Sequence, residues 1–148
     1  MIRPLFFRYM LVVVLVALAG CALGKKEWPA AQKSEDAFNL ELTLADRQAR
    51  CLMVNVAVSG AIERLYSASI QYEVVGDGEG EGCIGCPFIP RDAVHFTRHE
   101  KGFYLQGNKL KLSFCGFDPE KEYRFRIAGK SELSTAPLVY TDIFIATP

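Results

Sequence analysis

Apolar side chains recur at every second position along most of this chain, from Phe38 almost to its end. Side chains at every second position of a strand share one face, so the pattern predicts strands with one face in a core and the other in solvent. The segments that show it are 38–44, 52–58, 70–74, 94–96, 110–114 and 123–127, and a run rich in β-branched and aromatic residues, 138–146, adds a last strand.

Turn signals separate these segments. They include Ser59-Gly60, the glycine-rich stretch 76–82 and Gly107-Asn108, all of which favour tight turns over regular structure. Short strands joined in this way are typical of two antiparallel sheets packed face to face. The sequence therefore predicts an all-β domain, a seven-stranded antiparallel β-sandwich.

The N-terminal segment has a different composition. Arg3 and Arg8 lie in a short basic stretch, and the 12 residues from Tyr9 to Gly20 carry no charge. This layout is typical of a secretion signal, and the apolar run is shorter than the roughly 20 residues that a membrane-spanning helix needs. We expect residues 1–20 to be a signal peptide that is cleaved.

A cysteine follows the predicted signal peptide. Leu18-Ala19-Gly20-Cys21 resembles the lipobox of bacterial lipoproteins, in which a branched apolar residue and two small residues precede an obligatory cysteine. The resemblance implies that the Cys21 thiol carries the lipid, fatty acyl chains such as palmitate. We expect no other cofactor. Two or three acyl chains would hold the protein firmly at the membrane. Ala22, where inner-membrane retention requires Asp, favours the outer membrane of a Gram-negative cell by the same resemblance.

Residues 21–36 are polar and lack periodicity, so we expect a flexible tether before a folded domain at 37–148. Without the signal peptide the chain has 128 residues, enough for one domain with its own core. Loss of Arg3 and Arg8 leaves 15 basic against 17 acidic residues, a net charge of −2. A nearly neutral chain argues against nucleic-acid binding.

The segment 117–123 resembles the corner before strand F of fibronectin type III domains. Phe117 is followed by Pro119 and Tyr123, and apolar alternation then continues to Ala128. In such a corner the proline fixes the turn, while the tyrosine ring packs in the core and its hydroxyl bonds to nearby backbone. The resemblance covers roughly residues 36–148 and implies a fibronectin type III-like module. One departure is that the second strand, 51–58, lacks the core tryptophan usual in this family.

Four cysteines remain besides Cys21, and an even number in an exported protein predicts disulfides. Four cysteines permit three pairings. In the sandwich that the resemblance implies, strands B and E are antiparallel neighbours, which places Cys51 beside Cys115 on the outer face. Cys83 is then left to pair with Cys86.

The motif Cys83-Ile84-Gly85-Cys86-Pro87 also admits a redox pair or a metal site. Redox pairs at this spacing place the first cysteine at a helix N-terminus, which lowers its pKa. Proline at 87 and 90 instead predicts an irregular or edge segment. A structural staple is favoured, and an envelope thiol-disulfide or metal-handling protein that uses Cys83 and Cys86 is the alternative.

Two other patterns resemble metal-binding sites, but each lacks a required feature. The acidic stretch 77–81 imitates the start of a calcium loop, but Phe88 stands where the closing glutamate is required. His95 and His99 would share a face only on a helix, whereas the surrounding alternation predicts a strand. We expect no catalytic and no metal site. The favoured function is a noncatalytic interaction module in the cell envelope, attached to the membrane by its lipid and binding an envelope protein.

Overall fold

The computed structural model describes residues 34–146, so the predicted signal peptide, Cys21 and the predicted tether up to residue 33 lie outside the described residues. Within 34–146, no helix is long and apolar enough to cross a membrane. This part of the chain forms nine strands and two short 3-10 helices: η1 (Ser34–Asp36), β1 (Phe38–Gln48), β2 (Cys51–Gly60), η2 (Ile62–Arg64), β3 (Leu65–Val75), β4 (Asp92–Thr97), β5 (Phe103–Gln106), β6 (Lys109–Cys115), β7 (Glu122–Ser131), β8 (Val139–Tyr140) and β9 (Phe144–Ile145).

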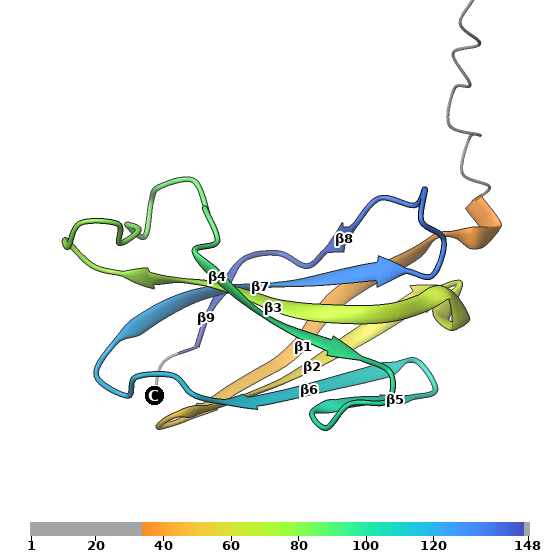
Figure 1. Ribbon diagram of the computed structural model, residues 1–148, viewed down its shortest axis with the longest axis horizontal. Helices are drawn as coiled ribbons and strands as arrows, with labels where there is room; N and C mark the ends of the chain where they lie inside the picture. Colours follow the sequence, from red (N-terminus) through yellow and green to blue (C-terminus); the bar gives the residue numbers. More distant parts are fainter. Residues whose placement is uncertain (1–33, 147–148) are drawn as a thin grey trace, which may run out of the picture. The chain divides into compact units, whose positions relative to one another are not determined.

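Two antiparallel sheets pack face to face (Figure 1). Sheet A has the strand order β1-β2-β6-β5, and sheet B has the order β4-β3-β7-β8, with β9 also pairing with β7. Every ladder between these strands is antiparallel. The predicted antiparallel β-sandwich is confirmed, and the order of sheet A is that of the ABED sheet of immunoglobulin constant-type domains.

The structure contains two more strands than the seven that were predicted. β5 is a four-residue strand with only Phe103 buried, too short to show an alternation, and it pairs with β6 across the Gly107-Asn108 turn. The last predicted strand is divided into β8 and β9. Between them the Ile127 N–H donates to the Thr141 hydroxyl at 3.0 Å, so a side chain interrupts the backbone ladder.

A β-bulge in β1 changes which of its side chains face the core. Leu42 is paired with Val56 and Leu44 with Asn55, so Thr43 is an extra residue in this strand. One extra residue shifts the alternation to the opposite face. Leu44, which the alternation assigns to the core, is therefore 55% exposed on the outer face.

The expected tether also ends earlier than predicted. Residues 34–36, assigned to it from composition, form η1. The Asp36 carboxylate lies 3.1 Å from the Arg64 guanidinium of η2, so this turn is attached to the sandwich.

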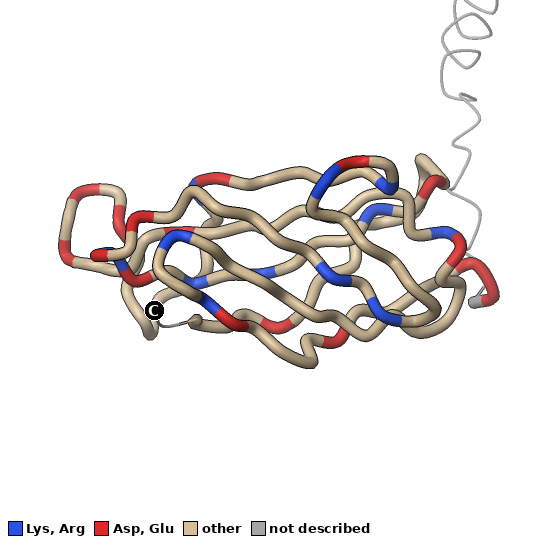
Figure 2. Tube along the Cα trace, turned by 90° about the horizontal axis from the view of Figure 1, so that it is seen from below, with Lys and Arg blue, Asp and Glu red and all other residues tan. Residues whose placement is uncertain are grey.

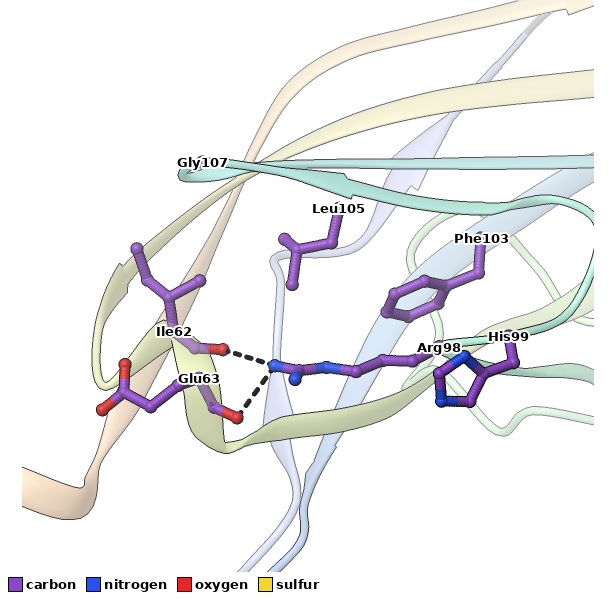
Figure 3. A pocket seen from close by; sticks show the side chains of 7 residues that line it. All are labelled: Ile62, Glu63, Arg98, His99, Phe103, Leu105 and Gly107. Atoms are coloured by element: carbon purple, nitrogen blue, oxygen red, sulfur yellow. Dashed lines mark hydrogen bonds between the residues drawn. The ribbon is translucent and has the colours of Figure 1, made fainter.

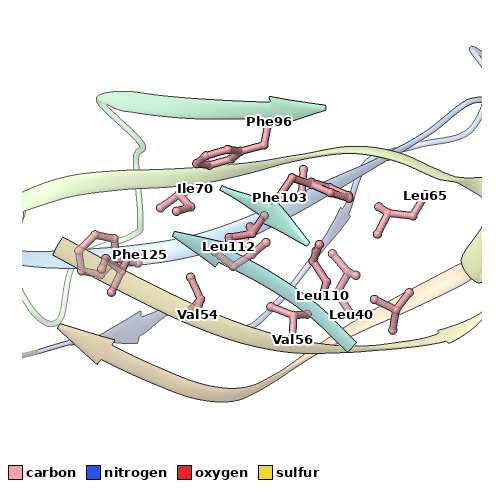
Figure 4. Close-up of a cluster of buried hydrophobic side chains, with 14 of the residues drawn as sticks. Leu40, Val54, Val56, Leu65, Ile70, Phe96, Phe103, Leu110, Leu112 and Phe125 are labelled. Atoms are coloured by element: carbon pink, nitrogen blue, oxygen red, sulfur yellow. The ribbon is translucent and has the colours of Figure 1, made fainter. Parts of the chain in front are cut away.

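The core fills the space between the sheets, as Figure 4 shows. Inward positions of β2 and β6 meet those of β3 and β7, and the side chains of Leu52, Ile70 and Leu110 have no exposed surface. Full burial of such a side chain contributes about 1.5–3 kcal/mol. This core makes the sandwich a rigid support for the loops at its ends and for its two outer faces.

Candidate functional site

The structure forms the corner expected at 117–123. The Asp118 N–H donates to the Tyr123 hydroxyl at 3.1 Å, and Pro119 lies in the turn between them. Phe117 is 2% and Tyr123 6% exposed, and their ring centroids are 5.2 Å apart. These three residues have a structural role, because they close one end of the core.

Tyr72 of β3 joins this aromatic cluster. Its ring meets the Phe117 ring edge to face at 5.0 Å, and its hydroxyl donates to the Asp92 carboxylate at 2.9 Å. Burial, together with the hydrogen bond to Asp92, raises the pKa of Tyr72 to about 12. The hydroxyl therefore stays protonated, and remains a donor, at any physiological pH.

Arg47, near the end of β1 in sheet A, is 3% exposed and fixes the corner that connects β6 to β7. Its guanidinium donates to the carbonyls of Lys121 at 2.8 Å and Asp118 at 2.6 Å. It also lies 5.0 Å from the centre of the Tyr123 ring. A charged side chain is tolerated at this depth because backbone carbonyls and an aromatic face surround it.

Both disulfides are formed between the cysteines that the resemblance implied. Cys51 and Cys115 lie opposite each other in the β2–β6 register and are bonded. Cys83 and Cys86 are bonded within the loop that connects β3 to β4. Cys83, Cys86 and Cys115 are exposed, and Cys51 is half-buried.

The loop 76–91, which we call the disulfide loop, covers an ion pair on the outer face of sheet B. Glu73 of β3 and Arg124 of β7 are directly opposite in register, and their side chains form a salt bridge. Alternation places both on the face turned away from the core, yet Glu73 is 2% and Arg124 4% exposed. A charged pair remains stable at this depth only when further hydrogen bonds satisfy its remaining atoms.

The disulfide loop supplies several of those hydrogen bonds through its backbone, while the buried Arg124 Nε has no partner among the described residues. Arg124 donates to the carbonyls of Ile84 at 3.1 Å and Cys86 at 2.8 Å. The Ile89 N–H donates to the Glu73 carboxylate at 3.3 Å. The ion pair thus holds both arms of the loop against sheet B.

The disulfide loop can lie close to Glu73 because residue 82 is a glycine. A Cβ atom at Gly82 would lie 2.8 Å from the Glu73 carboxylate, so a side chain at this position would displace that carboxylate. The Gly82 N–H also donates to the Val74 carbonyl at 2.8 Å, which fixes the start of the loop beside β3.

Outside the ion pair, the same face carries a stacked arginine. The Arg126 guanidinium lies over the ring of Phe88, 5.1 Å from its centre, and over the ring of Tyr140, 4.1 Å from its centre. Its Nε and one terminal nitrogen donate to the side-chain oxygen of Gln71 at 3.1 and 2.7 Å. These contacts fix the aromatic rings of the loop and of β8 in one arrangement.

Exposed apolar side chains surround this stack. Ile84 is 65%, Ile89 55%, Tyr140 41% and Ile145 41% exposed. Ile145 is paired with Arg124, so it belongs to the same outer face. We call the surface formed by the following residues the loop face: Ile84, Phe88, Ile89, Arg126, Tyr140 and Ile145.

Acidic residues gather in the disulfide loop where it follows β3, as Figure 2 shows. The Glu81 carboxylate accepts a hydrogen bond from the Gly78 N–H at 3.0 Å and lies 3.9 Å from the Lys121 ammonium. Within 34–146, no three His, Cys, Asp or Glu side chains are placed to hold a metal ion. The carboxylate of Glu81 instead shapes the turn at 76–82.

A hollow of about 520 Å³ lies beside η2 (Figure 3). Arg98 crosses it and donates to the carbonyls of Leu65 at 2.6 Å, Glu63 at 2.8 Å and Ile62 at 3.1 Å. The guanidinium is therefore engaged by the backbone and joins the end of β4 to η2. His99 lines this hollow.

Sequence reasoning missed Glu73 and Arg124. Each falls on the polar side of an alternating strand and was assigned to solvent. Opposite charges at paired positions of neighbouring strands are the one available signal, and the pairing is visible only after the β3–β7 register is known. The cysteine spacing indicated a closed loop but not the surface on which it lies.

No known family model matches the chain, and no curated protein does so. A similar solved structure is that of the chitinase ChiW from Paenibacillus sp. strain FPU-7, described as a bacterial cell-surface-expressed multi-modular enzyme. The similarity has a TM-score of 0.46 and 10% sequence identity, and covers 84% of this chain and 9% of the chitinase chain. This chain therefore corresponds to less than a tenth of the length of that enzyme.

Proposed function

We propose that this chain is a lipoprotein of the bacterial cell envelope whose β-sandwich is a noncatalytic module that binds an envelope protein through the loop face. The observation that carries the proposal is the contact of Arg126 with the rings of Phe88 and Tyr140, on a face that also carries exposed isoleucines. Tyrosine and arginine are enriched among the residues that dominate binding energy at protein interfaces.

The buried ion pair makes this surface ready to bind. Because Arg124 and Glu73 hold the disulfide loop in place, Phe88 and the loop isoleucines need little further ordering when a partner arrives. Ordering a mobile loop on binding costs about 0.5–1.5 kcal/mol for each immobilised side chain. A docked loop avoids much of that cost.

The lipid anchor rests on the resemblance of Leu18-Ala19-Gly20-Cys21 to a lipobox, and Ala22 favours the outer membrane. The tyrosine corner at Tyr123 supports a fibronectin type III-like classification of the sandwich. Display on a membrane anchor suits a binding module, because it concentrates the domain where its partner resides.

Site-specific photocrosslinking in cells tests the loop face. A photoreactive residue at Ile145 should capture one protein of defined mass, and Tyr140→Ala with Arg126→Ala should abolish that product in a folded domain. Glu41, exposed on sheet A, is the matched control position. An absent product at Ile145, or the same product at Glu41, would contradict the proposal.

Cys21→Ser tests the anchor separately, because a hydroxyl cannot form the thioether that holds the lipid. The variant should leave the membrane fraction or remain uncleaved, whereas the mature wild type should show added acyl mass at Cys21. An unmodified N-terminus at any other residue would refute the lipoprotein assignment.

Thiol-disulfide exchange is the second candidate, favoured by the exposure of the Cys83–Cys86 disulfide. A thiolate from another protein can reach an exposed disulfide. Counting free thiols in freshly isolated protein, with and without a chelator, tests it. Free thiols at both positions favour exchange or metal handling, and their absence favours the structural staple.

A further inference from the structure

The outer face of sheet A contains a hollow of about 480 Å³, on the layer of the sandwich opposite to sheet B. Its floor is formed by the two middle strands, β2 and β6, and one wall by β5. The residues that carry its chemistry are Asn55, Ala57, Tyr104, Gln106, Lys109 and Lys111.

Strand register arranges these residues in two rows across the sheet. In one row Asn55 is paired with Lys111, and Lys111 with Tyr104. In the other row Ala57 is paired with Lys109, and Lys109 with Gln106. Ala57 has the smallest side chain of the six, so the floor is lowest where the second row crosses β2.

The bulge in β1 extends the first row with an apolar side chain. It turns Leu44 outward and places it opposite Asn55. The row therefore runs from Leu44, 55% exposed, to Tyr104, 60% exposed, across three strand spacings or about 14 Å. Bulges commonly re-aim a side chain next to a functional surface.

The side-chain amide and ammonium groups that carry the chemistry of the hollow are not engaged by other described residues. Asn55, Gln106, Lys109 and Lys111 take no part, through their side chains, in the hydrogen bonds and ion pairs found between residues 34 and 146. Glu41, paired with Ala57, is the acidic residue of the second row. It stands two strands from Lys109, about 10 Å away, so it leaves the lysines free to meet an anionic ligand.

We propose that this hollow binds an acidic oligosaccharide, a class of ligand independent of the protein partner assigned to the loop face. Lys109 and Lys111 supply two cations for carboxylate groups, the amides of Asn55 and Gln106 bond to sugar hydroxyls, and the exposed ring of Tyr104 packs on the apolar face of a sugar ring.

A peptide strand fits this site less well. Peptides that bind sheets add to an open edge through backbone hydrogen bonds. The floor strands β2 and β6 are paired with each other and with β1 and β5 on either side. The outer face of these strands presents side chains and no free backbone groups. A ligand bound there must therefore be recognised through its own hydroxyl groups, carboxylates and rings.

Calorimetric titration of the mature, detergent-solubilised chain tests the proposal with three probes of matched length: oligogalacturonate, neutral cello-oligosaccharide and polyaspartate. Oligogalacturonate should bind, and the other two at least tenfold more weakly. Lys109→Gln with Lys111→Gln, and separately Tyr104→Ala, should each weaken oligogalacturonate binding at least tenfold without changing the melting temperature by more than a few degrees.

The matched control is Lys101→Gln with Lys130→Gln, two exposed lysines outside the hollow, and it should leave binding unchanged. Failure of oligogalacturonate to bind, equal binding of polyaspartate or of the neutral sugar, or equal weakening by the control pair would each overturn the proposal. Photocrosslinking at the loop face is unaffected by any of these results, so the two proposals fail separately.

Discussion

Two loops of this domain are each held by a buried arginine, and they differ in what else holds them. The corner at 117–123 is bound by Arg47 and the disulfide loop by Arg124, both below 5% exposure and both donating to loop carbonyls. Arg47 lies over the Tyr123 ring, whereas Arg124 is paired with the Glu73 carboxylate.

The difference lies in the core. The corner contributes Phe117 and Tyr123 to the hydrophobic core, whereas no residue of the fully described loop 76–91 belongs to that core. Arg47 therefore strengthens a loop that apolar packing already fixes. The disulfide loop has no such apolar anchor, so we expect the ion pair to determine the position of the part of the loop face that the loop supplies, Ile84, Phe88 and Ile89.

Arg124→Met should have the largest effect, a loss of about 3–5 kcal/mol in the free energy of unfolding, because Glu73 is left buried without its partner. Adding Glu73→Leu should restore part of the loss. Lys130→Met, an exposed position on the same strand, should change stability by less than about 0.5 kcal/mol. Denaturant unfolding measures all three, and a loss below about 1 kcal/mol for Arg124→Met would show that the ion pair is not needed.

The two disulfides should also differ in how much they stabilise the domain. Cys51 and Cys115 close a chain segment with a sequence separation of 64, for which the entropy of the unfolded chain predicts about 4 kcal/mol of stabilisation. The Cys83–Cys86 bond, with a separation of 3, should contribute about 2 kcal/mol or less. Thermal unfolding of the two double-alanine variants should show the larger drop in melting temperature for Cys51 and Cys115. Equal drops would contradict this ranking.

Tyr123→Ala should cost about 3 kcal/mol or more, because it empties a large aromatic site in the core. Tyr123→Phe keeps the ring, removes only the bond from the Asp118 N–H, and should cost about 1 kcal/mol. The free energies of urea unfolding of the two variants measure the contribution of the ring and that of the hydroxyl separately. A loss below about 1 kcal/mol for the alanine variant would mean that the corner does not depend on its tyrosine.

Arg47→Met should cost less than Arg124→Met, about 1–3 kcal/mol. It leaves two carbonyl groups without a donor but no buried charge. Urea unfolding of the two variants side by side gives the comparison, and the reverse order would contradict the distinction between the two loops.

The alternation predicted the sandwich because burial repeats at every second residue of its strands. The corner was predicted from the resemblance of 117–123 to fibronectin type III domains, a local motif whose partners are close in the chain. The pair of Glu73 and Arg124 joins positions 51 residues apart, so no local pattern reveals it.

Leu44 shows a second limit of sequence reasoning. A single inserted residue, Thr43, reverses the facing of the residues that follow. The bulge is stabilised by the bond from the Thr43 hydroxyl to the Asn55 carbonyl, at 2.9 Å, on the neighbouring strand, and periodicity within β1 alone does not contain that information.

Amide hydrogen exchange at Ile89, whose N–H donates to Glu73, tests most directly whether the ion pair, and not the disulfide, holds the loop face in place. The Phe117 amide, bonded to the Arg50 carbonyl in the corner, serves as the reference for opening of the rest of the domain. We expect Arg124→Met to speed exchange at Ile89 at least tenfold more than at Phe117, whereas Cys83→Ala with Cys86→Ala should leave Ile89 protected. Unchanged protection of Ile89 in Arg124→Met, or equal loss in the cysteine variant, would contradict this expectation.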